Sequence, residues 1–514
     1  MESASGSPSF LKNMLKRKVS LKIVLLIILF FVSVFFRFWQ IRDYVVFLGD
    51  EGRDMIVMRN IFVNGDIPFL GPSASVGGFY LGPVYYWMAA PFLWLSNFDP
   101  VGPAYFVAMV GVLTVFLLFK FLKDTVGLWP AFFASILYAT APLIVRYSRS
   151  SWNPNVLPFF ALLMIYFIYL GISKRKFLNF LFAGAAFGIS IQLHYLAVIL
   201  AVIGALIVFS NVNFKKWPSV FLLSLLGALI TFSPFFIFEL RHQFPNFKTI
   251  LEFVGRGSNI GYKSANLIFL ISDIGNIFLE EISLIMETFY TKIAFWILAG
   301  GSIWVTIKNW KEHQKRLISL VAIIWFIGGL IGLRFYTGQI YDYYFGFMFP
   351  APFFLGGLIF YQLWQTKLTK AVVVFTFVVL LFVFLGNGFY KSSPNKLIDQ
   401  TAQIANFIIE KTNGDSYNFA LISESNSDHA YRYFLETRMR PPIDLEEEVT
   451  NQLLVVCESK KCEPLGHPNW EIAGFGRAQI EGEWSLEKFG IKVFKLIHLS
   501  GQPSPAGKPA IKGG

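Results

Sequence analysis

The 514-residue sequence contains little cysteine, little histidine and little charge. Two cysteines and six scattered histidines cannot supply a Cys/His metal framework. Only 15% of the residues are charged, against about 25% in an average soluble domain, while 55% are hydrophobic. The sequence lacks a P-loop and a glycine-rich nucleotide fingerprint, which argues against ATP-driven transport and against a nucleotide-sugar donor. Polar residues are too few to cover a soluble fold, so the composition predicts an integral membrane protein.

The net charge of +12 is unevenly distributed along the chain. Residues 389–514 hold 14 Lys and Arg against 16 Asp and Glu, whereas residues 1–388 hold 30 basic and 16 acidic residues. The basic excess therefore lies between hydrophobic segments, where it indicates membrane topology. Nucleic acid is not an expected partner, whereas the lipid bilayer is.

Apolar runs of about the length needed to cross a bilayer follow a polar, basic N-terminus. We expect residues 1–20 in the cytoplasm and Leu21–Phe36 as a retained signal anchor, because no small-residue cleavage site follows it. The sequence predicts eleven spans, near residues 21–36, 103–122, 127–145, 155–172, 177–193, 196–210, 218–238, 292–307, 317–333, 343–365 and 371–388.

The segment Tyr80–Ser96 is apolar but short, and it contains Pro91. It could span the membrane or lie along the outer interface. If it does not span, the loops on the cytoplasmic side carry thirteen basic and two acidic residues. The positive-inside bias favours this interfacial placement, which leaves residues 43–102 as an outer loop of a plasma-membrane protein.

The chemistry of the chain changes near residue 390. Patterns of apolar residues in 389–499 predict a small α/β domain outside the cytoplasm, and residues 500–514 are rich in Pro, Gly, Ser and Lys and are expected to be disordered. Cys457 and Cys462 lie in this domain, where they form either a disulfide or two free thiols. The expected fold is an all-α polytopic membrane domain over residues 21–388 followed by this α/β domain.

An acidic motif, Gly49-Asp50-Glu51-Gly52-Arg53-Asp54, follows the first span directly. Asp50 is placed to cap a helix in which Met55, Met58 and Phe62 share one face. The motif is then either a helix start on a solvated loop or a functional site. A carboxylate at the interface can deprotonate a hydroxyl acceptor beside a membrane-embedded donor.

Three more polar and aromatic clusters end spans on the predicted outer face. An arginine at such a position can bind a phosphate, and an aromatic ring can stack on a sugar; ordinary interface anchoring explains the same residues equally well. The candidates are Arg149, Trp152 and Asn153; His194 and Tyr195; and Arg334, Tyr336 and Tyr343.

The acidic motif, Gly82-Pro83-Val84-Tyr85-Tyr86 and the segment Tyr147–Asn155 together resemble a known group of enzymes. Residues 20–390 are similar to the GT-C glycosyltransferases that use polyprenyl-phosphate sugars, and most similar to the bacterial branch related to protein mannosyltransferases and the lipid A aminoarabinose transferase.

The resemblance implies an inverting transferase with its site on the outer face, Asp50 as general base and Glu51 beside it. It implies a polyprenyl-phosphate-sugar donor and a hydroxyl acceptor on an envelope glycan, lipid or protein. We expect Arg53 and the three clusters to bind the donor. Hard cations bind carboxylates, so whether Mg²⁺ or Mn²⁺ binds between Asp50, Glu51 and Asp54 stays an open question. The alternative function is a transporter or lipid flippase without transferase activity.

Overall fold

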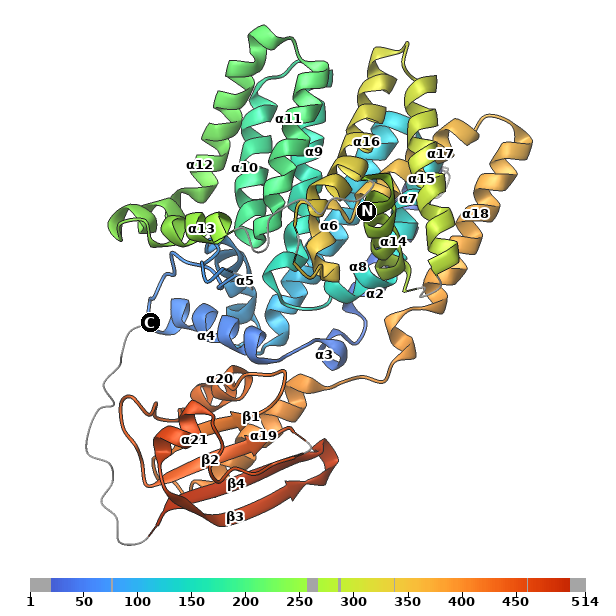
Figure 1. Ribbon diagram of the computed structural model, residues 1–514. Coiled ribbons are helices and arrows are strands. Elements are labelled where there is room, and N and C mark those ends of the chain that lie inside the picture. Colours follow the sequence, from blue (N-terminus) through green and yellow to red (C-terminus); the bar gives the residue numbers. More distant parts are fainter. Residues whose placement is uncertain are drawn as a thin grey trace, which may run out of the picture.

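The computed structural model describes residues 20–74, 77–256, 267–284, 288–336, 338–459 and 461–499. A bundle of apolar helices is followed by a smaller domain built on a β-sheet, and the helix α4 lies between the two (Figure 1). The residues predicted as the tail, 500–514, and residues 1–19 lie outside the described residues.

Among the described residues, seven helices are long and apolar enough to cross a membrane. An eighth candidate is the bent pair η4–α17, and three shorter apolar segments, α7, α10 and η2–α11, lie at other predicted spans. The helices of the bundle are α2 (Leu21–Phe38), α6 (Val101–Val126), α7 (Leu128–Thr140), α8 (Pro142–Tyr147), η1 (Asn153–Val156), α9 (Leu157–Ser173), α10 (Leu178–Leu193), η2 (Tyr195–Val198), α11 (Ile199–Asn211), η3 (Phe214–Lys216), α12 (Trp217–Arg241), α15 (Thr288–Lys308), α16 (His313–Arg334), η4 (Asp342–Met348), α17 (Ala351–Leu363) and α18 (Lys367–Gly386).

The chain is therefore a multi-pass membrane protein, as its composition predicted. Seven or eight spans are supported by length and composition, and the count of eleven stays a prediction. The shorter helices of 13 to 17 residues rise about 20–26 Å, less than the hydrocarbon thickness of about 30 Å.

Further helices outside the bundle lie in the predicted outer loop, residues 43–102, and between the predicted spans near 218–238 and 292–307. They are α3 (Ile41–Tyr44), α4 (Gly49–Val63), α5 (Val84–Leu95), α13 (Pro245–Arg256) and α14 (Leu267–Ser283). With 12 residues, α5 extends about 18 Å, too short to span, in keeping with the predicted interfacial placement of Tyr80–Ser96.

The C-terminal domain contains a four-stranded mixed sheet in the order β1-β2-β4-β3. β1 and β2 run parallel, and β4 is antiparallel to both β2 and β3. Its elements are η5 (Phe389–Lys391), α19 (Leu397–Lys411), β1 (Asn418–Ile422), α20 (His429–Thr437), β2 (Gln452–Cys457), α21 (Trp470–Phe475), β3 (Ala478–Leu486), η6 (Glu487–Phe489) and β4 (Ile491–His498). Cys457, at the end of β2, is joined to Cys462 by a disulfide.

Arg42 ties this domain to the membrane bundle. Its guanidinium donates to Asp99, just before α6, at 2.5 Å and to Asp399 in α19 at 2.7 Å. The three charged groups are partly exposed, so each ion pair contributes only modestly on its own. Together they hold the start of the outer loop, a membrane helix and the C-terminal domain at one point.

Candidate active site

The acidic motif forms the first turn and a half of α4. The helix begins at Gly49, one residue before the predicted cap, so Asp50 lies inside the first turn. Glu51 takes the capping role instead, because its carboxylate accepts a hydrogen bond from the Leu48 N–H at 3.0 Å. Asp50 is thereby left free of backbone capping, and its side chain is 60% exposed.

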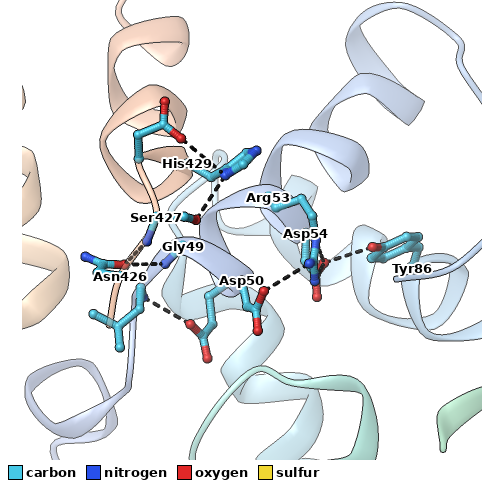
Figure 2. Close-up of polar contacts among 11 residues, drawn as sticks. Gly49, Asp50, Arg53, Asp54, Tyr86, Asn426, Ser427 and His429 are labelled. Carbon is cyan, nitrogen blue, oxygen red and sulfur yellow. Dashed lines mark hydrogen bonds and ion pairs between the residues drawn. The ribbon is translucent and has the colours of Figure 1, made fainter. Parts of the chain in front are cut away.

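Arg53 lies between two carboxylates of the same helix (Figure 2). It donates to Asp50 at 2.9 Å and, through two nitrogens, to Asp54 at 2.9 and 3.0 Å. Asp54 is fully buried and also accepts from the Tyr86 hydroxyl at 2.8 Å. Tyr86 and Asp54 thus fix the Arg53 guanidinium from one side, while Asp50 contacts it from the exposed side.

Burial changes the protonation of two of these acids. Desolvation raises the pKa of Glu51 to about 7, although the Leu48 N–H favours the ionised form. Desolvation also raises the pKa of Asp54 to about 6, against the opposing effect of Arg53.

The raised pKa of Glu51 gives a pH-dependent stability that Glu51→Gln should remove. Between about pH 4.5 and pH 7 the unfolded chain loses this proton while the folded chain keeps it, so the free energy of unfolding falls as pH rises. The glutamine oxygen can still accept from Leu48 without ionising. We expect the melting temperature of Glu51→Gln, relative to wild type, to rise across this window.

The same melting series contains its own control. At pH 4 the side chain of Glu51 is largely protonated and thus neutral, like the glutamine of Glu51→Gln. Wild type and Glu51→Gln should therefore melt alike at this pH. A difference in melting temperature between the two proteins that stays constant from pH 4 to pH 7.5 would contradict the raised pKa of Glu51.

A cavity of about 190 Å³ brings together residues that are far apart in the sequence. Asp50 and Arg53 line one side, and the turns after α8 and α10 supply the other. The lining residues are Asp50, Arg53, Pro72, Ser73, Ala74, Leu81, Trp152, Asn153, Pro154, His194, Tyr195 and Tyr343.

Aromatic rings form one wall of the cavity that Asp50 also lines. The rings of Trp152 and Tyr343 meet edge to face with centroids 4.6 Å apart, and those of His194 and Tyr195 stack at 4.6 Å. Asn153 holds this wall to the end of α10, because its amide donates to the Leu193 carbonyl at 2.6 Å. Such a wall suits the apolar faces of a sugar ring.

His194 presents a hydrogen-bond donor at this wall. Burial lowers the pKa of His194 to about 3, so the imidazole is neutral. Its Nδ1 accepts from the Leu196 N–H at 3.2 Å, which places the proton on Nε2. Nε2 is buried and has no hydrogen-bond partner within the part of the chain that the structure describes. A ligand in the cavity could satisfy this donor.

A larger, mainly apolar groove of about 570 Å³ adjoins the cavity. The two share Arg53, Pro72 and Ser73, so the guanidinium lies at the boundary between a polar and an apolar space. The groove is lined by Arg53, Val57, Pro68, Phe69, Leu70, Gly71, Pro72, Ser73, Tyr80, Tyr86, Phe238 and His242.

Four of the predicted catalytic and donor-binding residues do not line the cavity: Glu51, Arg149, Arg334 and Tyr336. Tyr336 is buried and packs edge to face against Tyr344, with ring centroids 5.5 Å apart. Arg334 is the last residue of α16. The prediction also missed contributors. Pro72 and Ser73, in the loop after α4, were not among the predicted site residues. Tyr86 was predicted only as part of a motif and not as a partner of Asp54.

Arg149 is engaged in structural contacts instead of facing the cavity. It donates to the carbonyls of Phe36 and Trp39 at 3.0 and 2.8 Å, and its guanidinium lies 3.8 Å from the ring centroid of Phe389. The geometry therefore gives no support to its expected phosphate-binding role.

Arg149→Met should consequently destabilise the protein without weakening donor binding. Loss of two hydrogen bonds from a buried guanidinium is expected to cost about 2–4 kcal/mol of unfolding free energy, while the donor KM stays within about twofold. Melting curves and steady-state kinetics measure the two effects, with Arg53→Met as the comparison that should raise KM. A large rise in the donor KM of Arg149→Met at unchanged melting temperature would restore the phosphate-binding role.

The acids do not form a metal centre in this arrangement. Glu51 turns back to the backbone, and Asp54 is enclosed by Arg53 and Tyr86. In the described ranges no group of three His, Cys, Asp or Glu residues could hold a metal ion.

Comparisons with known proteins agree with this architecture. Residues 81–238 match the family described as dolichyl-phosphate-mannose-protein mannosyltransferase. They include α5 and the turns that carry Trp152 and His194. The match covers about a third of the chain and lies within residues 20–390, over which the short motifs predicted the resemblance.

Solved structures of glycosyltransferases share the fold over most of this chain. ArnT from Cupriavidus metallidurans bound to undecaprenyl phosphate superposes with a TM-score of 0.57 at 15% identity, covering 92% of this chain and 97% of that one. An oligosaccharyltransferase from Archaeoglobus fulgidus in complex with Zn and sulfate gives 0.50 at 16% identity, covering 81% and 62%. Curated proteins yield no match in sequence.

Proposed function

We propose that this protein is a glycosyltransferase that moves a sugar from a polyprenyl-phosphate donor to a hydroxyl group of an envelope glycan, lipid or protein. The observation that carries the proposal is the cavity, which is lined both by Asp50, with its exposed carboxylate, and by an aromatic wall that includes His194. The undecaprenyl phosphate bound by the structurally similar ArnT supports the class of donor.

Transfer would proceed as a single displacement with Asp50 as the general base. The acceptor hydroxyl gives its proton to the Asp50 carboxylate while its oxygen bonds to C1 of the sugar. The bond between C1 and the phosphate oxygen breaks, and its electron pair leaves with polyprenyl phosphate. Attack from the face opposite the leaving group inverts the configuration at C1.

The two adjoining spaces suit the two parts of such a donor. The aromatic wall would take the sugar, and the apolar groove the first isoprene units. Arg53 lies where the spaces meet, so it would contact the phosphate between them, with the His194 Nε2–H as a second donor. Tyr195 and Tyr343 complete the wall on the sugar side. Asp54 and Tyr86 would keep Arg53 in place as the phosphate charge grows.

The site would face the outside of the plasma membrane. The N-terminus would then be cytoplasmic, and the C-terminal domain would lie on the same side as the cavity. The supporting observation is the loop charge, since thirteen basic residues gather on the opposite side.

The test is an assay on the purified protein in liposomes with a synthetic polyprenyl-phosphate sugar. The proposal predicts equal amounts of released polyprenyl phosphate and of glycosylated acceptor. Movement of the lipid across the bilayer without either product would support the flippase instead and overturn the proposal.

A further inference from the structure

The C-terminal domain contacts α4 at unusually close range. An added Cβ at Gly52 would lie 2.3 Å from the backbone nitrogen of Ala430, and one at Gly49 would lie 1.8 Å from the Ser427 hydroxyl. Both glycines are on the turn that carries Asp50, so α20 and the segment before it pack directly on the acidic motif (Figures 1 and 2). This approach is possible only because neither position has a side chain.

The topology of the sheet brings two polar residues to this contact. β1 and β2 run parallel, so their carboxyl ends lie at the same edge, where Asn426 follows β1 and Glu458 follows β2. The Asn426 amide donates to both oxygens of Glu458 at 3.1 and 3.2 Å. The Tyr431 hydroxyl donates to the same carboxylate at 2.7 Å. Asn426 is therefore held in one orientation by its own domain.

The fixed oxygen of Asn426 then reaches across to α4. Asn426 Oδ1 accepts a hydrogen bond from the Gly49 N–H at 2.8 Å, as Figure 2 shows, and from its neighbour Ser427 at 2.9 Å. Gly49 N–H is one of the first backbone donors of the helix, which lack partners within it. The start of α4 is thus completed by the C-terminal domain in addition to its own Glu51 cap.

Ring contacts and a further hydrogen bond also join the two domains near this turn. The Phe47 ring packs edge to face against Tyr433 and Phe434, with centroids 6.2 and 5.5 Å apart. The Tyr433 hydroxyl donates to the Phe98 carbonyl at 2.6 Å. The two domains are therefore joined on either side of the acidic turn.

We propose that Asn426 is a positioning residue for transfer, held by Glu458 and Tyr431, and that through it the C-terminal domain sets the place of Asp50. Neither Asn426, Glu458 nor Tyr431 lines the cavity, so the effect would act on geometry and not on donor contact. The inference rests on the proposed role of Asp50. A catalytic group displaced by about 1 Å can lose about 100-fold in rate, so a small shift of this turn is sufficient.

A pair of charge-swapping substitutions tests the proposal. Asn426→Asp keeps the acceptor for Gly49 but sets a carboxylate against Glu458, so kcat should fall about tenfold or more, with a donor KM within about twofold. Adding Glu458→Gln restores a donor–acceptor pair and should return kcat to within about twofold of wild type. Asn451→Ala, an exposed asparagine of the same domain, is the matched control and should change neither value.

Hydrogen exchange separates this proposal from the function on which it rests. Amide exchange in residues 47–56 should accelerate in Asn426→Asp and recover in the double variant, whether or not the assay has the right donor. Unchanged exchange in Asn426→Asp, or no recovery in the double variant, would overturn the proposal. So would recovered exchange without recovered kcat. An active Asp50→Asn would instead remove the function proposed for α4.

Discussion

Replacing Asp50 by asparagine should lower kcat by about 10²- to 10⁴-fold, the range expected when a general base is removed. The asparagine keeps the size of the side chain and can still accept from Arg53, whose other partner, Asp54, is unaffected. Donor binding should therefore change little, and the loss should appear in kcat. Transfer from a synthetic polyprenyl-phosphate sugar by the purified variant gives both constants.

Asp66→Asn is the matched control for this substitution. Asp66 is an exposed aspartate in the turn after α4 and lines neither the cavity nor the groove. It should leave both constants unchanged. Near-wild-type turnover by Asp50→Asn would show that another group takes the proton.

Gly52→Ala should have the second-largest effect, although it adds a single methyl group. The new carbon would lie 2.3 Å from the Ala430 nitrogen and 2.4 Å from the His429 carbonyl carbon, both backbone atoms, so α4 and α20 must move apart. We expect a loss of about 1–3 kcal/mol in stability from overpacking and a fall in kcat of about 10- to 100-fold. Melting curves and steady-state kinetics on the same preparation measure both.

Gly300→Ala provides the matched control in a helix of the bundle. A Cβ at Gly300 meets nothing within 4 Å, so this substitution should cost neither stability nor activity. Normal kcat in Gly52→Ala would show that the contact between α20 and α4 has no bearing on transfer.

Hydropathy alone predicted most of the membrane region, because a span is a local property of about twenty residues. The same holds for the apolar runs of β1, β2 and β4, which belong to the patterns in 389–499 from which the α/β domain was predicted. The edge strand β3 was not predicted. Its side chains are largely exposed and polar, and Gly482 follows an irregularity in its register, so its sequence resembles a loop.

The candidate site was only partly predictable because it depends on contacts between distant segments. Trp152, Asn153, His194 and Tyr343 end spans on one side, and that placement alone suggested that they meet. The orientation of a side chain is a different matter. Arg149 also follows a predicted span on that side, but it donates to the carbonyls of Phe36 and Trp39 and does not line the cavity. The role of Asn426 also lay beyond sequence reasoning, because it depends on how two domains are docked.

The configuration of the newly formed glycosidic bond tests the central claim most directly. Purified protein would be given a polyprenyl-phosphate sugar of known anomeric configuration, and the product of a single turnover would be examined by NMR. A direct displacement assisted by Asp50 predicts a fully inverted C1 and one polyprenyl phosphate released for each sugar transferred. Retention at C1, or transfer without release of polyprenyl phosphate, would contradict it.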